Sequence, residues 1–208
     1  SYYQRRGKRC MDLILAVGVL ILVSPILAVC AIAVKLGSGG PVLFKQTRVG
    51  RGGKPFLLLK LRSMKVGSQS GPMVTSAGDL RVTSIGRWLR RMKFDELPQL
   101  VNVIHGDMSL VGPRPEVPEY VMLYSELHRE VLNCRPGITS PTSLDYIEEE
   151  SILAQAGNPE HFYRDFIMPR KLETDLKYCR SINLQTDISL LLRTIRRIWT
   201  KRQSGVTP

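Results

Sequence analysis

Residues Leu13–Val34 read LILAVGVLILVSPILAVCAIAV, 22 residues without a charged side chain, interrupted near the middle by Ser24-Pro25. As one unbroken helix the run would be about 33 Å long, enough to cross a bilayer core of roughly 30 Å. Pro25 has no N–H, and its ring crowds the carbonyl four residues earlier, so a helix through it should bend or break. Each half, of about 11 residues, then reaches only mid-bilayer. The run therefore predicts a helix-break-helix that enters one leaflet and returns.

Basic residues flank this run on both sides. Those before it are Arg5, Arg6, Lys8 and Arg9, and those after it are Lys35, Lys45, Arg48, Arg51 and Lys54. Because basic residues mark the cytoplasmic side, both ends are expected there. Three alternatives stay open: an ordinary membrane span, since proline is tolerated in membrane helices, a cleaved signal peptide, whose apolar core is usually shorter, and a buried helix of a soluble core, which is seldom this long.

The charge of the chain is unevenly distributed. The 208 residues carry a formal net charge of +12, and residues 1–94 contain 17 basic and only 2 acidic side chains. A positive field beside an apolar run suits anionic lipid headgroups and phosphorylated substrates. No zinc-finger spacing or RNP-type motif is present, so a nucleic-acid partner is not expected. The chain has room for one compact domain, and we divide it into a membrane segment, residues 1–36, and a domain, residues 37–208.

Cysteine and histidine residues do not indicate a metal centre. The cysteines, at positions 10, 30, 134 and 179, have no CxxC spacing, and the three histidines are scattered. Neither a disulfide framework nor a zinc site is expected, which favours a reducing, cytosolic setting.

The rest of the chain predicts a mostly helical α/β fold. Val42–Val49 and Pro55–Leu61 form a β-hairpin around a glycine-rich turn. Residues 66–79 are polar and turn-rich, and are either a lid or a solvated loop. Helices are predicted at 84–92, 97–104, 117–132, 144–156, 159–178 and 186–202. The last is basic and amphipathic, so it either lies on a membrane surface or packs on the domain.

Two adjacent carboxylates, Asp95 and Glu96, are expected at the start of the helix that Gly106 ends. Acidic residues at a helix N-terminus usually serve only as caps. Here Arg90 precedes the pair, and Arg114 follows between two prolines that restrict its backbone. A guanidinium near carboxylates suits phosphate binding, because its planar fork donates two hydrogen bonds to phosphate oxygens. A carboxylate that attacks phosphorus needs such cations.

Several motifs in a fixed order resemble one family. They are Phe44-Lys45-Gln46-Thr47-Arg48-Val49-Gly50, Lys60-Leu61-Arg62-Ser63-Met64, Arg81-Val82-Thr83 with Ile85-Gly86, Asp95-Glu96-Leu97-Pro98-Gln99-Leu100, Asn102-Val103, Gly106-Asp107-Met108-Ser109 and Val111-Gly112-Pro113-Arg114-Pro115. From about Arg9 to Thr194 the chain closely resembles the bacterial sugar transferases, the monotopic phosphoglycosyl transferases, in their small single-domain form.

The resemblance implies an arrangement and a reaction. It implies a re-entrant helix kinked at Ser24-Pro25 and a catalytic domain on the cytoplasmic face of the bacterial inner membrane, in contact with membrane lipids. The enzyme is expected to transfer a sugar 1-phosphate from a UDP-sugar to undecaprenyl phosphate, with Mg²⁺, releasing UMP. This is the first membrane step of glycoconjugate synthesis, for exopolysaccharide, O-antigen or capsule. A homo-oligomer stays open.

The resemblance also implies roles for single residues. Asp95 is the expected nucleophile that forms a covalent phosphosugar intermediate, and Glu96 assists by metal or proton handling as the lipid phosphate attacks. Asp95 and Glu96 would hold the magnesium, which prefers oxygen ligands. The expected phosphate-binding residues are Lys60, Arg62, Arg90 and Arg114, with Asn102 as a polar support. Covalent catalysis at one shared site predicts ping-pong kinetics.

The chain departs from the family pattern at one place, and two other functions stay open. The family commonly has glycine after Pro136-Gly137-Ile138-Thr139, where this chain has Ser140-Pro141, so sugar selection is not transferred. The acidic run Glu148–Glu150 that follows is expected to be a solvated face. The rivals are a non-catalytic basic adaptor that binds anionic lipid, and a polytopic-type transferase that acts without a covalent intermediate.

Overall fold

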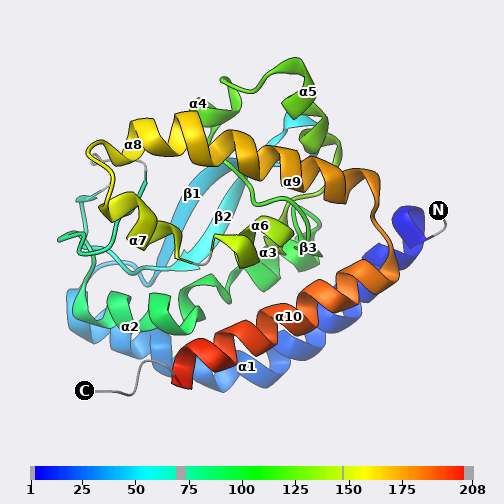
Figure 1. Cartoon of the computed structure of the whole chain (residues 1–208). Helices are drawn as coiled ribbons and strands as arrows, with labels where there is room; N and C mark the ends of the chain where they lie inside the picture. The colour runs from blue at the N-terminus through cyan, green and yellow to red at the C-terminus, as the bar shows by residue number, and fades with distance from the viewer. Residues whose placement is uncertain (1–2, 69–73, 147, 204–208) are drawn as a thin grey trace.

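A computed structural model of the chain describes residues 3–68, 74–146 and 148–203, without the side chains of Arg5 and of residues 198–203. The fold is mostly helical, with a long N-terminal helix on one side of a compact domain (Figure 1). Residues 69–73 of the predicted loop and residues 204–208 of the predicted domain lie outside this description. The lid prediction for residues 66–79 therefore stays a prediction.

The elements follow one another closely. They are α1 (Lys8–Ser38), β1 (Leu43–Val49), β2 (Pro55–Leu61), α2 (Ser84–Met92), a 3₁₀ turn (Phe94–Glu96), α3 (Gln99–His105), β3 (Ser109–Val111), α4 (Pro118–Val121), α5 (Glu126–Arg129), β4 (Gly137–Thr139), α6 (Pro141–Asp145), α7 (Glu149–Ala154), α8 (Pro159–Phe162), α9 (Met168–Arg180) and α10 (Leu184–Gln203). The predicted helices 117–132 and 144–156 are shorter segments, and a π-helical turn, Tyr163–Ile167, joins α8 to α9.

Helix α1 runs without a break through Pro25, where the sequence analysis predicted two helices separated by a break. Proline at position 25 leaves the carbonyl of Ile21 without its helical donor. The Ser24 hydroxyl donates to that same carbonyl at 2.9 Å, so the lost hydrogen bond is replaced and the helix continues. Figure 1 shows the two halves of α1 meeting at a bend, as proline in a helix generally produces.

Both ends of α1 are attached to the domain. Near its start, Arg9 donates to the carbonyls of Val103 and Ile104 at 2.5 and 2.9 Å, at the end of α3. Asp12 is fully buried and accepts from the Leu110 N–H at 3.0 Å. At the other end Cys30 and Val34 pack with Leu61 and Leu89 in one apolar cluster. The two ends of the helix therefore face the same body of protein.

The middle of α1 remains exposed. Ile14, Ile21, Leu22 and Val29 are between 67% and 78% exposed. Within the described residues, α1 alone is long and apolar enough to cross a bilayer, a criterion of length and composition only; 11% of its most apolar window is buried.

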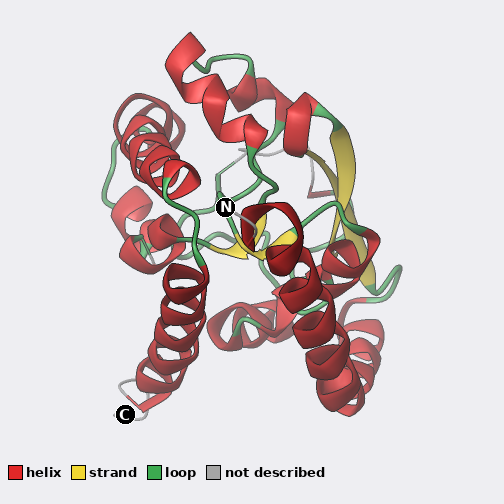
Figure 2. Cartoon of the chain, turned by 90° about the vertical axis from the view of Figure 1, so that its right-hand side faces the viewer, coloured by secondary structure: helices red, strands yellow, loops and turns green. Residues whose placement is uncertain are grey.

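Helix α10 starts beside the start of α1. The fully buried Asp187 accepts from Lys8 at 2.5 Å and from the hydroxyls of Tyr3 and Tyr178, each at 2.6 Å. From this junction both helices extend along the same side of the molecule (Figure 2). Exposed apolar side chains continue along α10, namely Leu184, Ile188, Leu192 and Ile195. The two helices therefore give one side of the protein an apolar character.

Two small sheets position the site. The predicted hairpin is confirmed: β1 and β2 are antiparallel, from Leu43 opposite Leu61 to Val49 opposite Pro55. A second, parallel pair, β3 with β4, was not predicted from the sequence. It depends on a close approach of two glycines, since a Cβ on Gly137 would lie 2.1 Å from the backbone nitrogen of Gly112. This contact places Gly112, directly after β3, beside the first residue of β4. The parallel pairing, with Val111 opposite Thr139 and the Gly112 N–H donating to the Thr139 carbonyl at 2.9 Å, then brings the loops after the two strands together.

Candidate active site

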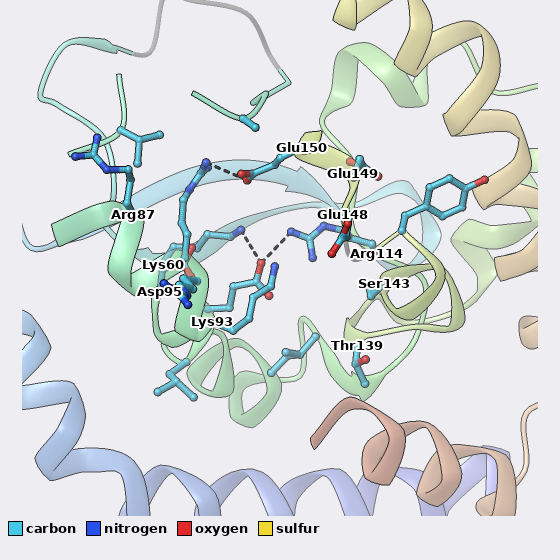
Figure 3. A pocket seen from close by; sticks show the side chains of 18 of the residues that line it. Lys60, Arg87, Lys93, Asp95, Arg114, Thr139, Ser143, Glu148, Glu149 and Glu150 are labelled. Carbon is cyan, nitrogen blue, oxygen red and sulfur yellow. Dashed lines mark hydrogen bonds and ion pairs between the residues drawn. The ribbon is translucent and has the colours of Figure 1, made fainter. Parts of the chain in front are cut away.

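A cavity of about 1260 Å³ lies between α2, the 3₁₀ turn, α6, α7, and the helices α1 and α10. Charged side chains line it, including Lys60, Lys93 and Arg114 (Figure 3). Apolar side chains line it as well, including Leu15, Leu191 and Ile195. The cavity therefore has room for a ligand with both an anionic part and a hydrocarbon part.

The carboxylate pair lies in the 3₁₀ turn between α2 and α3, not in the first turn of α3 as predicted. Helix α2 ends at Lys93, which has a left-handed backbone (φ 58°) and donates its N–H to the Arg90 carbonyl at 3.1 Å. This turn sends the chain back toward β2 and places Asp95 and Glu96 at the cavity wall. Pro98 and Gln99 then start α3.

Glu96 holds two cations that come from different elements. Its Oε1 lies 3.2 Å from Lys60 Nζ, on β2, and 3.0 Å from Arg114 Nη2, in the loop after β3. Burial acts to raise the pKa of Glu96, but the attraction of Lys60 and Arg114 outweighs it and holds this pKa well below its ordinary value. Burial lowers the pKa of Lys60, which Glu96 opposes, and Glu96 raises the pKa of Arg114. Glu96 is therefore ionised and balances the positive charges of Lys60 and Arg114.

Asp95 differs from its neighbour in its partners. It is 5% exposed, and its Oδ1 has no hydrogen-bond partner among the described residues. Burial raises the pKa of Asp95, and the nearby Lys60 only partly opposes that effect. A buried, unpaired carboxylate oxygen at a cavity wall is costly unless a ligand uses it. Asp95 lines the cavity, and Lys60, Lys93 and Arg90 favour its charged form, so its carboxylate is placed to attack an electrophilic phosphorus or to bind a metal.

The remaining predicted site residues divide into two groups. Arg90 lines the cavity and pairs with Glu150 at 3.1 Å. Arg62 lies outside the lining; its guanidinium donates to the Ser38 hydroxyl at 2.8 Å and to the Gly39 carbonyl, so it holds the end of α1. Asn102 also lies behind the site. It donates to the Leu57 carbonyl at 2.8 Å and accepts from the Leu59 N–H at 3.0 Å, which joins α3 to β2.

Sequence reasoning missed one wall of the cavity. Thr139, Thr142 and Ser143, around the start of α6, line it together with Glu148–Glu150. The acidic run is therefore not simply a solvated face, because Glu149 pairs with Lys171 at 2.7 Å and Glu150 pairs with Arg90. Ser140 followed by Pro141 is a readable helix start, but only the parallel pairing of β3 and β4 places that start beside Arg114.

The donor set is suited to a weakly held divalent cation. The described residues contain no group of three or more His, Cys, Asp and Glu side chains arranged to hold a metal. Two adjacent carboxylates, one with a free oxygen, match the way Mg²⁺ is usually bound, through one or two carboxylates plus substrate phosphates and waters. The residues present therefore fit magnesium as a partner that arrives with a phosphorylated substrate.

Comparisons with known proteins show which family the chain is similar to. A family model described as "Bacterial sugar transferase" matches residues 3–201. The chain is 38% identical over 204 residues to the UDP-glucose:undecaprenyl-phosphate glucose-1-phosphate transferase of Escherichia coli (strain K12), and 37% identical over 206 residues to a protein of the same name from Caulobacter vibrioides. It is 35% identical over 192 residues to the uncharacterized sugar transferase EpsL of Bacillus subtilis.

The matches differ in how much of each relative they cover. They include 92–94% of this chain in all three cases. The chain spans 40% of the E. coli relative, 70% of the C. vibrioides relative and 86% of the B. subtilis relative. The family match, over residues 3–201, includes both α1 and the residues that line the cavity.

Proposed function

Because this chain belongs to the bacterial sugar transferase family, we propose that it transfers a sugar 1-phosphate from a UDP-sugar to undecaprenyl phosphate and releases UMP. The names of the E. coli and C. vibrioides relatives specify this donor and acceptor class. The single observation that carries the mechanism is the carboxylate of Asp95 at the cavity wall, with Oδ1 unpaired among the described residues and with Lys60, which Glu96 holds, close by.

The first step is an attack by Asp95. Its Oδ1 forms a bond to the phosphorus that bears the sugar, and the bond from that phosphorus to the bridging diphosphate oxygen breaks. UMP leaves with the bonding electrons. Lys60, Arg90 and Arg114 bind the phosphate oxygens, which offsets the repulsion between a carboxylate and an anionic diphosphate.

The second step regenerates Asp95. A phosphate oxygen of undecaprenyl phosphate attacks the same phosphorus, the Asp95–phosphorus bond breaks, and the product is undecaprenyl diphosphate sugar. Glu96 keeps Lys60 and Arg114 in place through both steps, and through these cations it assists the incoming phosphate. Because both halves use one site, UMP must leave before the lipid phosphate attacks.

Asp95 and Glu96 would hold magnesium together with the substrate phosphates. When bound, the ion neutralises phosphate charge and polarises the phosphorus. Lys60, Arg90 and Arg114 perform the same charge neutralisation from the protein side.

The arrangement of α1 supports a monotopic protein. Both ends of α1 dock on the same domain, while its apolar middle is exposed. A helix whose ends contact one globular body enters and leaves a bilayer on the same side. We assign that side to the cytoplasmic face of the inner membrane, where the basic residues that flank the apolar run meet anionic lipids.

The apolar part of the cavity fits the acceptor. It is lined by Leu15 and Val19 of α1 and by Leu191 and Ile195 of α10, on the side of the molecule that carries the exposed apolar residues. A polyprenyl chain that lies among these side chains brings its phosphate from the bilayer toward Asp95.

UMP release tests the proposal directly. Purified protein with magnesium, undecaprenyl phosphate and a panel of UDP-sugars should release UMP, and the Asp95→Asn variant should not. Absence of UMP above that control for every UDP-sugar would favour the rival basic adaptor that only binds anionic lipid.

Mass spectrometry separates the two enzymatic routes. Enzyme mixed with a UDP-sugar alone should gain the mass of one phosphosugar on Asp95. If UMP is released only when the lipid is present and no adduct forms, the polytopic-type route without a covalent intermediate is favoured instead.

A further inference from the structure

A chain of hydroxyl groups runs from a buried carboxylate to the cavity wall. Thr142 Oγ1 lies 3.1 and 3.2 Å from the two carboxylate oxygens of Asp175 on α9. Ser140 Oγ lies 2.8 Å from Thr142 Oγ1 and 2.9 Å from Ser143 Oγ. Asp175, Ser140 and Thr142 are all buried. Thr142 and the more exposed Ser143 line the cavity, and Ser143 lies on the side away from Asp95 (Figure 3).

The carboxylate fixes the direction of this chain. Above about pH 7, where Asp175 is ionised, its carboxylate only accepts hydrogen bonds, so the Thr142 hydroxyl donates to Asp175. The Thr142 oxygen then accepts from the Ser140 hydroxyl. The Ser140 oxygen in turn accepts from the Ser143 hydroxyl and from the Ser143 N–H, which lies at 2.9 Å. Ser143 thus donates its only hydroxyl proton away from the cavity, and its oxygen meets a ligand only as an acceptor.

The same carboxylate connects the hydroxyl chain to the phosphate-binding part of the site. The backbone N–H of Arg114 donates to Asp175, so Asp175 holds both the Arg114 main chain and Thr142. The close approach of Gly112 and Gly137 keeps the two loops together. A ligand whose phosphate contacts Arg114 therefore has its adjoining group next to α6.

We infer that Ser143 is a specificity-determining residue that accepts a hydrogen bond from one hydroxyl of the transferred sugar, with Thr142 and Asp175 as the positioning residues that orient it. The inference rests on the proposed function. A site built to accept from a hydroxyl discriminates against the analogue that lacks it, because the acceptor is then left unpaired. The segment concerned, Thr139–Ser143, is also where this chain departs from the common family glycine.

Monodeoxy analogues test the inference. The UDP-sugar that gives the fastest UMP release is compared with its monodeoxy analogues, each altered at one hydroxyl, on the unaltered protein. For one analogue kcat/KM should fall by about 3- to 10-fold, the effect of one neutral hydrogen bond. In Ser143→Ala the ratio of kcat/KM for the parent UDP-sugar to kcat/KM for that analogue should fall to about 1, because the parent sugar loses the same contact. Unchanged ratios for every analogue in Ser143→Ala overturn the inference.

Two variants of Thr142 separate orientation from packing. Thr142→Val has nearly the same shape without the hydroxyl, so it should reduce the ratio between parent and analogue. Thr142→Ser keeps the hydroxyl and should preserve the ratio. Equal ratios in the two variants overturn the role given to Thr142, and thermal unfolding shows that both are folded. If the unaltered protein releases no UMP from any UDP-sugar, the proposed function fails and this inference with it; if it releases UMP with unchanged ratios, only the inference fails.

Discussion

The Nη2 atom of Arg114 lies 3.0 Å from the Oε1 atom of Glu96, and this ion pair distinguishes Glu96 from the adjacent Asp95. Glu96 forms ion pairs with Lys60 and Arg114, whereas the Oδ1 atom of Asp95 has no hydrogen-bond partner among the described residues. We therefore expect Glu96→Gln to leave the nucleophile present and to affect the second step more than the first.

In Glu96→Gln, steady-state UMP release should fall by about 100-fold, the lower end of the range for disturbing one preorganised charged contact to the reacting phosphate. The phosphosugar adduct on Asp95 should accumulate, because its transfer to the lipid is slowed. Rapid-quench mass spectrometry with and without undecaprenyl phosphate measures this. A folded Glu96→Gln protein that forms no adduct would contradict the division of roles.

Lys60 should contribute to donor binding through its charge. Burial works against that charge, and Glu96 maintains it. Lys60→Met keeps most of the length and removes the charge, so kcat/KM for the UDP-sugar should fall by about 10- to 100-fold, as for loss of a charge-assisted hydrogen bond. Lys45→Met, on the exposed face of β1, is the matched control and should change kcat/KM by less than about twofold.

The parts of this structure that local patterns determine were predictable from the sequence. The hairpin of β1 and β2 and the end of α3 at Gly106 followed from residue type and spacing. The proximity of Lys60, Asp95 and Arg114 was predicted by the family resemblance, since the three residues lie on separate elements.

Long-range contacts determine the parts that were missed. The parallel pairing of β3 with β4 joins segments about 25 residues apart through two glycines, and strands of three residues carry no periodicity. The contacts of Arg62 and Asn102 were likewise not predicted, because their partners Ser38 and Leu57 are distant in sequence. The break predicted at Pro25 did not occur because Ser24, the residue before it, replaces the missing hydrogen bond.

The contact between Gly112 and Gly137 should be sensitive to any side chain. A Cβ on Gly137 would lie 2.1 Å from the Gly112 nitrogen, which is backbone and has nowhere to move. Gly137→Ala should therefore destabilise the fold by about 1–3 kcal/mol, as overpacking does. A Cβ on Gly157 would have nothing within 4 Å, so Gly157→Ala should leave the midpoint of thermal unfolding nearly unchanged. Thermal unfolding in detergent compares the two, and equal midpoints would contradict the close approach.

Asp175 should make stability depend on pH. Burial raises its pKa to about 7, although Thr142, Lys171 and the Arg114 N–H favour the charged form; Asp145 acts in the same direction as burial. Because the folded pKa lies above the unfolded value, the stabilising contribution is full below about pH 4 and is lost as pH rises through 7. Asp175→Asn removes this titration. The difference between the thermal unfolding midpoint of the variant and that of the unaltered protein should therefore increase, in favour of the variant, from pH 4 to pH 8. A constant difference across that range would contradict a raised pKa.

Pro25 should decide on which side of the membrane the start of α1 lies. The bend lets both ends of the helix return to one face, whereas a straight helix of 31 residues would be about 46 Å long and could cross the bilayer. In a variant whose other cysteines are serine, exposed Cys10 should react with an impermeant maleimide only from the cytoplasmic side. Pro25→Leu should make a fraction of Cys10 reactive from the opposite side. If Cys10 keeps its side in Pro25→Leu, then the docking of Arg9 and Asp12 on α3 and β3, rather than the bend, sets the topology.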